Sequence, residues 1–527
     1  MSRSLQRKIN EGKGTLVDIE GRYTTLSSTR NNYLDRGQAY SRMTLPFILP
    51  ETKPRSGDAN QHGFSGIGAQ AVNHLANKLV MSMFPPQASF FKLEFTEEAK
   101  STLKEAGYDP TQLAELLVSA EKKARLFQEK ISSRVALVEV MKHLIISGNV
   151  LLQVMPGDKP LRAIPLDRYV INRTLDGVLL ELITVQEKEF MAYPENVQEA
   201  LKVAKKAPKN ANEMVKLYTY VYSSENGEDL YDVVQSANGV LLNDKQTLKR
   251  DDLPWIPLRW NSAYGEDYGR GLCEDHAGDL YTVEFLSEAI AKGMVLMADV
   301  KYLVRPGSVT DIDELSSAPT GEYIFGNLDD IGVLQLEKYA DFKPISEVLN
   351  EYKRRIGQAF MLNSAIRRDA ERVTTYELRL DAQELETSLG GVYSLLAQTL
   401  QRPFAWLLLR RVGFPVPEEM VLPSILTGLE ALGRAGDLDK IMQFTEMMQM
   451  PQSWPQQIQQ RTKFDVYARQ VAASLSMEME WMMTDEEFQE LQQAQQAQMQ
   501  EQQLMQEASK AAPDVIKQQM TGEQNGR

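Results

Sequence analysis

Leu-Asn-Ser-Ala-Ile-Arg-Arg-Asp-Ala-Glu-Arg-Val, residues 362–373, separates two segments that both have strong helical patterns. Before it, apolar residues recur at helical spacing, namely Ile345, Val348, Leu349, Tyr352, Ile356, Ala359 and Phe360. After it, Thr374 and Glu377 have the spacing of a capping box, in which each side chain accepts a hydrogen bond from the other residue's backbone N–H. One face of a long helix follows, marked by Leu378, Leu385, Leu389, Val392 and Leu396. The sequence therefore predicts a loop held between two packed helices, carrying three arginines at a fixed place: Arg367, Arg368 and Arg372.

The charge of the whole chain makes these arginines a local exception. Lysine and arginine number 58 against 72 aspartates and glutamates, which gives a formal net charge of −14. A protein that grips duplex DNA neutralises phosphates with a basic surface, and this chain has no excess of basic residues. Simple solubility is the first interpretation of the acidic balance.

Length and composition indicate a globular protein. A chain of 527 residues can form about two to four domains. Cys273 is the only cysteine, which excludes an intramolecular disulfide, and the absence of paired cysteines excludes a zinc finger. The N-terminal residues lack an apolar segment, and no apolar run approaches the roughly 18 residues that a membrane span needs. We therefore expect no signal peptide, no membrane contact and synthesis in a reducing cytoplasm.

Residues 1–265 are predicted to form one α+β domain. Apolar stripes indicate helices at about 66–84 and 110–147, the second ended by Gly148. Asp176-Gly177 lies between two apolar runs and is a hairpin signal, and further strand patterns cover 150–154 and 217–222. Together these strands are predicted to form an antiparallel meander. The expected fold class is α+β, mostly helical.

The second half of the chain places a small insertion between two helices. Helical patterns cover about 272–298 and 343–361, and glycine and proline punctuate short strands between them, at about 301–342. If the two helices pack antiparallel, the insertion projects from their far end.

A long helix is then predicted from Thr375 to about Arg411, with a bend at Gly390-Gly391 and a kink or an end at Pro403. A helical region reaches about residue 483, and a Gln-rich segment at about 485–509 is predicted to form a helix. A disordered interaction tail is the alternative for the Gln-rich segment. The residues from Pro513 are predicted to be disordered.

No motif carries a strong catalytic signal. Residues 66–71, Gly-Ile-Gly-Ala-Gln-Ala, fit a dinucleotide fingerprint, but a polar loop precedes them where that fingerprint needs a hydrophobic strand. A translocating ATPase would need a P-loop, and the sequence has none. Asp311, Asp313 and Glu314 lack the later residues of a calcium loop and are predicted to begin a helix. We therefore expect no enzyme activity, no cofactor and no metal site.

Several blocks of the sequence, in order along residues 60–440, resemble those of one protein family. They are Asn73–Leu79 with Phe84-Pro85, Ser147–Leu152, Tyr268–Arg270, Leu336–Phe342, Ala359–Ala365, Glu371–Thr374, Thr387–Ser394 and Thr427–Arg434. In this joint order the chain resembles the portal, or head-to-tail connector, proteins of T7-like short-tailed bacteriophages.

The resemblance implies a portal-type fold with wing, stem, clip and crown or barrel regions. In these terms the expected division is 1–265 for the wing, 266–300 and 343–361 for the two stem helices, 301–342 for the clip, 362–373 for the tunnel loop, 374–424 for a long kinked helix of the wing or core, 425–483 for the crown, 484–512 for a Gln-rich barrel helix and 513–527 for a disordered tail.

The resemblance also implies a function. Such proteins form a ring of about twelve subunits at one capsid vertex of the virion, assembled in the host cytoplasm, and conduct double-stranded DNA during packaging and ejection. The expected partners are the large terminase subunit, tail adaptor and nozzle proteins, major capsid and scaffolding proteins, and internal core proteins. A role in nucleating procapsid assembly is expected as well. The alternative is a structural or scaffold-type ring protein without a DNA-conducting role.

Within that family, the basic loop corresponds to the narrowest point of the channel. Arg367, Arg368 and Arg372 of each subunit would then form a circle of guanidinium groups that touches phosphates transiently. The acidic wall elsewhere would let DNA slide. The alternative is a solvated loop whose arginines form weak surface pairs with Asp369 or Glu371.

Three further basic residues lie on the helix before the loop: Lys353, Arg354 and Arg355. They are candidates for a channel-facing surface of the stem. A solvated helix face is the simpler interpretation of such a charge run.

Overall fold

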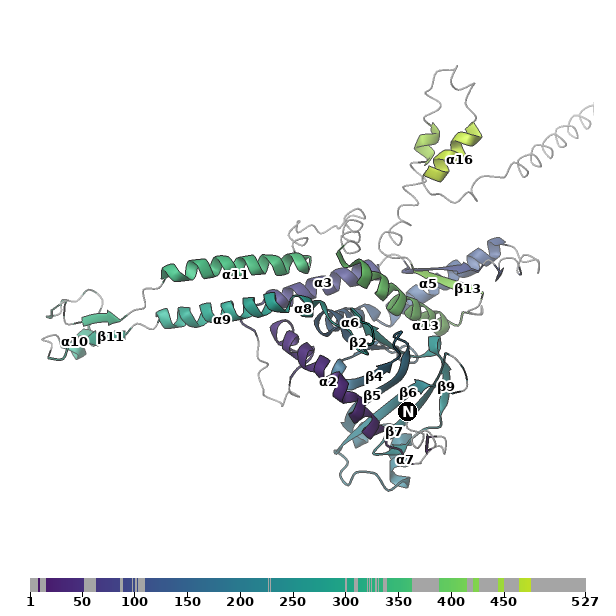
Figure 1. Cartoon of the computed structure of the whole chain (residues 1–527), viewed down its shortest axis with the longest axis horizontal. Helices are drawn as coiled ribbons and strands as arrows, with labels where there is room; N and C mark the ends of the chain where they lie inside the picture. Colours follow the sequence, from purple (N-terminus) through teal and green to yellow (C-terminus); the bar gives the residue numbers. More distant parts are fainter. Residues whose placement is uncertain are drawn as a thin grey trace, which may run out of the picture. The chain divides into compact units, whose positions relative to one another are not determined.

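The computed structural model of the chain is drawn in Figure 1. The residues that it describes are 8–9, 16–51, 63–85, 89–96, 98–99, 102, 110–225, 227, 229–298, 301–307, 311–319, 321, 323, 325–327, 329, 331–334, 339–362, 388–414, 420–425, 444–449 and 464–474. They divide between two compact units, residues 1–432 and 433–527.

The largest sheet is the antiparallel meander that the sequence predicts. Its strands are β4 (Tyr169–Arg173), β5 (Leu179–Glu189), β6 (Met214–Ser223), β7 (Leu230–Ala237), β8 (Val240–Leu241) and β9 (Gln246–Lys249). They pair in the order β4-β5-β6-β7, and β8 and β9 both pair with β7. The β4–β5 turn contains Gly177 with φ +84°, a left-handed conformation that glycine adopts without a steric penalty. This confirms the hairpin at Asp176-Gly177.

The first predicted strand does not belong to that meander. β2 (Asn149–Gln153) lies in a separate sheet between β10 (Trp255–Arg259) and β3 (Arg162–Ile164), both antiparallel to it. The expectation of one meander is therefore wrong for this strand. Its four buried residues in succession suit the centre of a sheet that is covered on both faces.

Residues 1–265 do not complete their own core, which corrects the predicted domain boundary. β1 (Phe91–Phe95) pairs with β13 (Val421–Ile425), over 300 residues later in the chain. The helix before β13 adds Phe404, whose ring lies 6.0 Å from that of Phe84 and 5.9 Å from that of Phe90. The hydrophobic core of the first unit thus needs both ends of that unit.

Helices cover these sheets. They are α2 (Ile19–Met43), α3 (Ile67–Met83), α5 (Pro110–Lys130), α6 (Ser133–Ser147) and α7 (Glu195–Val203). α3 confirms the helix predicted at 66–84. The stretch predicted at 110–147 is two helices, because Ser132 takes a left-handed conformation with φ +49° and breaks the run. Gly148 (φ +74°) ends α6, as expected.

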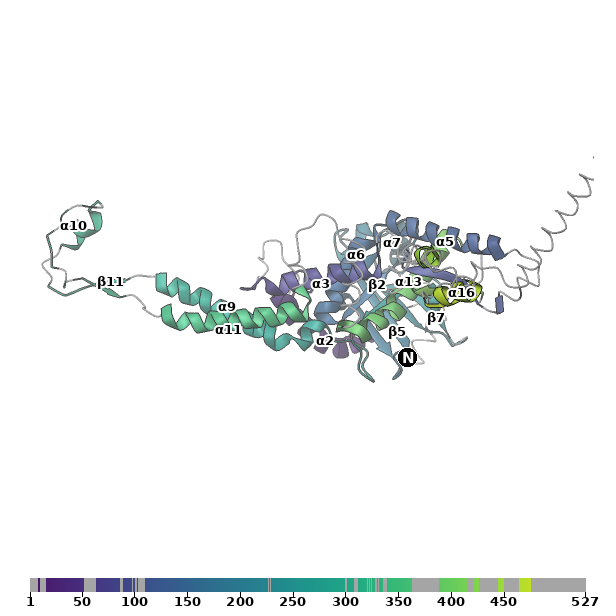
Figure 2. The same ribbon diagram turned by 90° about the horizontal axis from the view of Figure 1, so that it is seen from above.

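Two antiparallel helices extend from this body. α8 (Leu272–Asp275) leads into α9 (Ala277–Ala298), and α11 (Tyr339–Ala359) lies beside α9 (Figure 1). The sequence places the start of the second helix at 343, whereas it begins at Tyr339, so that Pro344 lies inside the helix. Figure 2 shows the same pair of helices from above.

The insertion between these helices is a small α/β unit, as the glycine and proline pattern predicts. β11 (Lys301–Val304) pairs antiparallel with β12 (Ile331–Leu334), and α10 (Ile312–Ser317) lies between them in the chain. The unit lies at the ends of α9 and α11 that are farther from the sheets (Figures 1 and 2).

The helix after the basic loop is described from residue 388 onward. It is helical over 388–396, has a π-helical turn (η6, Ala397–Gln401) and continues as α13 (Arg402–Val412). Pro403 therefore does not end the helix. The wider π turn lies directly before it, where the proline ring would clash with the carbonyl of a regular turn. The range 374–424 is too long for this helix, since Gly413 ends it and β13 follows.

In the second unit the described residues are helical at 444–449 and in α16 (Phe464–Ser474), within the helical region predicted to about 483. The predicted Gln-rich helix and the tail lie outside the described residues. Among the helices of the described part, none has the length and apolarity to cross a membrane.

Candidate functional site

The predicted site residues fall into two groups. Arg367, Arg368 and Arg372 lie outside the described residues, whereas Lys353, Arg354 and Arg355 lie near the end of α11. Consecutive residues of an α-helix point about 100° apart, so these three cannot all face one side. The buried side of α11 carries Leu349, Ile356 and Phe360.

Arg354 lies on the solvent side of α11 and is paired within its own helix. Its Nη2 lies 2.7 Å from Glu351 Oε1, and its Nε donates to Oε2 at 2.9 Å. This bidentate hydrogen bond lowers the pKa of Glu351 and raises that of Arg354. Lys353 makes no ion pair with the described residues. The exposed side of the helix thus carries a neutralised pair and one additional positive charge.

Arg355 has a different role, because it joins the two helices. Its Nη2 lies 3.0 Å from Asp279 Oδ1 at the start of α9, and its guanidinium lies over the Tyr352 ring at 5.1 Å. The contact shows that the end of α11 lies beside the start of α9, which confirms the antiparallel packing. Among these three residues, it is therefore Arg355 whose ion pair joins the two helices of the α9–α11 hairpin.

Removing Arg355 should loosen the hairpin locally. Arg355→Ala loses a half-exposed ion pair and a cation–π contact, together about 1 kcal/mol. Hydrogen exchange in α11 and the first turns of α9 should become faster. Arg354→Ala is the matched control, since its partner lies on the same helix, and it should leave exchange in α9 unchanged. Equal effects of the two variants would contradict the assignment.

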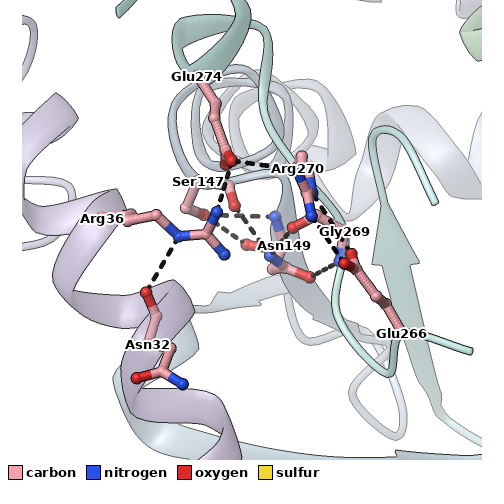
Figure 3. Close-up of polar contacts among 8 residues, drawn as sticks. All are labelled: Asn32, Arg36, Ser147, Asn149, Glu266, Gly269, Arg270 and Glu274. Atoms are coloured by element: carbon pink, nitrogen blue, oxygen red, sulfur yellow. Dashed lines mark hydrogen bonds and ion pairs between the residues drawn. The ribbon is translucent and has the colours of Figure 1, made fainter. Parts of the chain in front are cut away.

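The base of the hairpin is attached to the body by a polar cluster (Figure 3). Arg36 of α2 lies with Nη1 2.5 Å from Glu274 Oε1 of α8. Arg270 donates to Glu266 at 2.7 Å and also lies 3.8 Å from Glu274. The hydrogen bond from Arg270 lowers the pKa of Glu266 and keeps it ionised. Glu274 thus connects α2 and the segment before α8.

Asn149 holds that segment against the end of α6 (Figure 3). Its Nδ2 donates to Gly269 O at 2.8 Å and to Ser147 O at 2.8 Å, and its Oδ1 accepts from Gly269 N at 2.7 Å. Asn149 is 1% exposed, so these bonds are shielded from water. The amide side chain therefore acts as a backbone-like bridge between two segments that lie 120 residues apart.

Glycines make this close approach possible. A Cβ at Gly269 would lie 2.8 Å from Gly148 O, and one at Gly271 would lie 2.7 Å from Ile145 O. These contacts are with backbone atoms, which cannot rotate away. The sequence blocks at Ser147–Leu152 and Tyr268–Arg270, found separately along the chain, thus meet in one joint.

A further contact attaches α9 to α3. The Glu284 carboxylate accepts from Phe64 N at 2.6 Å and from Ser65 N at 3.1 Å, just before α3 begins. In a dinucleotide site, backbone N–H groups at such a helix start would face phosphate. Here the chain's own carboxylate occupies the Phe64 and Ser65 donors. This favours the interpretation of the glycine motif as a loop that enters a helix.

The acidic residues of the insertion also have a structural role. Asp311 Oδ1 accepts from Asp313 N at 2.9 Å and from Glu314 N at 3.4 Å, which confirms that the cluster begins a helix. Within the part of the chain that the structure describes, no three His, Cys, Asp or Glu side chains gather as metal ligands would.

Sequence analysis missed two aromatic residues of the insertion and the polar joint. Tyr323 and Phe325 are 99% and 92% exposed. Their signal was present, since two aromatic residues stand between Gly321 and Gly326, in a stretch where glycines indicate a surface turn. The signal for the polar joint was Gly148-Asn149 in one sequence block and Gly269 in the other. These residues indicate a joint only once the two blocks are known to be in contact.

Comparison with known proteins agrees with the stated resemblance. Residues 17–483 match the family model described as bacteriophage head to tail connecting protein. The portal protein of Enterobacteria phage SP6 is 42% identical over 98% of this chain and 99% of its own length. The portal protein of Escherichia phage T7 is 37% identical, covering 80% of each chain.

Among solved structures, a chain from the neck of an empty gene transfer agent particle is 14% identical with a TM-score of 0.34, covering 71% of this chain and 84% of that chain. The sequence relatives are more similar in sequence, at 37–42% identity, and cover 80–98% of this chain. The chain therefore belongs to the family of bacteriophage head-to-tail connecting proteins, together with the portal proteins of T7-like phages.

Proposed function

We propose that the chain assembles into a closed ring of about twelve copies that forms the DNA channel at one capsid vertex of the virion. The observation that carries the proposal is the match to a phage portal protein over 98% of the chain. The ring would conduct double-stranded DNA during packaging and ejection and would nucleate procapsid assembly. No catalytic step is assigned to the chain, so a separate motor protein would supply the energy.

In this proposal the α9–α11 hairpin is the stem and the sheets with their helices are the wing. The hairpin is attached at its base through Glu284, which binds the segment before α3, and through Glu274, which binds Arg36 of α2. Arg355 holds its two helices together through Asp279. Stem helices held in this way would stand at a constant angle around the axis of the ring. On the exposed side of α11, Arg354 is neutralised by Glu351, which suits a wall that does not hold phosphate.

The basic loop would form the constriction. It begins after Phe360 and Met361, which are 0% and 4% exposed, so its starting point is fixed in the core. Arg367, Arg368 and Arg372 of every copy would project from such a point and make transient contacts with DNA phosphates. Residues 425–483 and 484–512 are proposed as crown and barrel, facing the packaged DNA and internal core proteins.

The insertion at 301–342 is proposed as the clip, which would receive the large terminase subunit and afterwards tail adaptor and nozzle proteins. Large aromatic side chains are the common anchors of protein interfaces, and Tyr323 and Phe325 of this unit are almost fully exposed. Capsid and scaffolding proteins are the proposed partners of the wing.

Truncating this aromatic pair should impair docking without affecting the ring. Tyr323→Ala with Phe325→Ala should weaken terminase binding by about 2 kcal/mol or more, roughly thirtyfold, if both side chains are anchors. Surface plasmon resonance on purified rings would measure it. Tyr264→Ala is the matched control, because Tyr264 is 84% exposed but lies outside the insertion. Unchanged affinity in the double variant would remove these residues from the docking surface.

The ring itself can be tested first. Light scattering on the purified protein, with negative-stain images of the same fraction, should give a mass of about a dozen subunits and a central hole. If the protein is monomeric alone, scaffolding protein is added. A monomer under both conditions would contradict the proposal.

A further inference from the structure

The surface at the end of α7 carries four exposed lysines. Lys202, Lys205, Lys206 and Lys209 are all exposed, and none forms an ion pair with the described residues. Residues 200–212 contain no acidic residue, so this segment holds four positive charges in a chain of net charge −14. Some exposed lysines elsewhere are paired, as in Lys130–Asp158 and Lys292–Glu288, whereas others, such as Lys122 and Lys123 of α5, form no ion pair with the described residues. The four lysines near α7 differ in that they lie within eight residues with no carboxylate between them. We call these four residues the lysine patch.

The backbone that carries the lysine patch is firmly held. Val197 and Leu201 are buried on the inner side of α7, within a small apolar cluster against the sheet. Beyond the helix, Lys206 N donates to Leu201 O at 2.9 Å, and Asn238 Nδ2 donates to Lys206 O at 3.0 Å. The lysines therefore project from a preformed surface, so binding there would not require the backbone to become ordered.

One lysine occupies a position that favours glycine. Lys205 has φ +56° directly after the helix, the left-handed conformation in which glycine usually ends helices. Its place near the negative end of the helix dipole partly explains the preference for a cation there. That explanation does not extend to Lys206 and Lys209, which lie beyond the helix.

Exposed apolar side chains accompany the charges. Val203 is 85% exposed, and Met191 and Met214 are 60% and 54% exposed. Met191 N donates to Ala211 O at 3.3 Å, which places Met191 beside the segment that returns from the lysine patch. Flexible methionines are common on surfaces that accept varied apolar partners. Glu189 and Glu213, both exposed, lie close in sequence to the two methionines, whereas Val203 directly follows Lys202. Positive charge and exposed apolar area thus meet at Val203.

We propose that this surface binds an acidic, amphipathic helical segment of a partner protein. Carboxylates on one side of such a segment would pair with the lysine patch, and apolar residues would cover Val203 and the methionines. Duplex DNA fits less well. Residues 194–216 contain no arginine and no aromatic residue, the types that add most to phosphate and base contacts, and DNA has nothing to cover the apolar side chains. The inference does not depend on DNA passing through a channel.

The test uses the whole purified protein and a fluorescent synthetic helical peptide of about five turns, with glutamate on one face and leucine on the other. Fluorescence anisotropy should show saturable binding that weakens with salt. Lys202→Glu with Lys206→Glu should lower the affinity about tenfold or more. Lys122→Glu with Lys123→Glu, an exposed pair on α5, is the matched control and should leave binding unchanged. Circular dichroism would show that both variants are folded.

A second variant separates the apolar contribution from the charge. Val203→Ser should weaken binding of the amphipathic peptide but not of polyglutamate. Equal affinity of the wild-type protein and the Lys202/Lys206 variant would overturn the proposal, as would the absence of peptide binding. If a duplex oligonucleotide binds there and the peptide does not, the surface is a nucleic-acid site and the proposal is wrong.

Discussion

Gly148→Ala should destabilise the first unit by about 3 kcal/mol or more, the largest effect expected of a single methyl group in this chain. The left-handed conformation at φ +74° costs a residue with a Cβ about 1–2 kcal/mol. In addition, the new Cβ would press on the backbone of Arg270 and lie 2.5 Å from Gly271 N. The joint between α6 and the base of the hairpin would have to open. Hydrogen exchange at residues 145–152 and 268–274 would measure the opening.

Gly157 provides a matched control, since it has φ +69° and no atom lies within 4 Å of the Cβ position. Gly157→Ala should carry the backbone penalty alone, about 1 kcal/mol. The difference between the two variants therefore isolates the steric contact at the joint. Equal destabilisation would mean that the close approach of Gly148 to residues 270 and 271 contributes nothing.

The second large effect concerns DNA. Arg367→Ala with Arg368→Ala should leave rings intact but reduce the yield of DNA-filled particles by about tenfold or more, because the proposed constriction would lose two charge-assisted phosphate contacts in every copy. Complementation of a phage that lacks the gene, followed by density-gradient separation of filled and empty heads, would measure it.

Arg367→Lys with Arg368→Lys tests whether charge is sufficient. Lysine keeps the positive charge but not the forked geometry of the guanidinium group, so this variant should retain much of the filled-head yield. Negative-stain images of rings would show that assembly is unaffected. An unchanged yield with the alanine pair would rule out the loop arginines as the constriction.

Local patterns along the chain predicted most of the elements. Helical spacing and glycine signals placed α3, the β4–β5 hairpin and the small unit between α9 and α11, because each depends on residues close in sequence. The start of a helix at Asp311, Asp313 and Glu314 was predicted for the same reason. The rule that a proline ends or kinks a helix was incomplete at Pro403, since the π turn before it leaves room for the proline ring.

Pairings between distant segments could not be predicted. Nothing in residues 91–95 indicates that their partner is β13, and nothing in β2 indicates β10. The three candidate channel-facing residues of α11 differ in their contacts for a similar reason. Lys353, Arg354 and Arg355 look alike in the sequence, and only the position of Asp279 on α9 distinguishes Arg355 from the others. Tertiary contacts decide which of these positive charges are already paired and which remain available to a partner.

The pairing of β1 with β13 also determines how early the first unit can complete its fold during translation. At roughly 15 residues per second, the ribosome needs about 20 seconds to move from Phe95 to Val421. Throughout that interval the edge of β1 that pairs with β13 has no strand partner. The rings of Phe84 and Phe90 also lack their contacts with Phe404, which has not yet been synthesised for most of that time. An unpaired strand edge beside exposed aromatics attracts neighbouring nascent chains. We therefore expect the yield of folded chain to respond to chaperones that cover this strand during translation as well as to the stability of the finished protein.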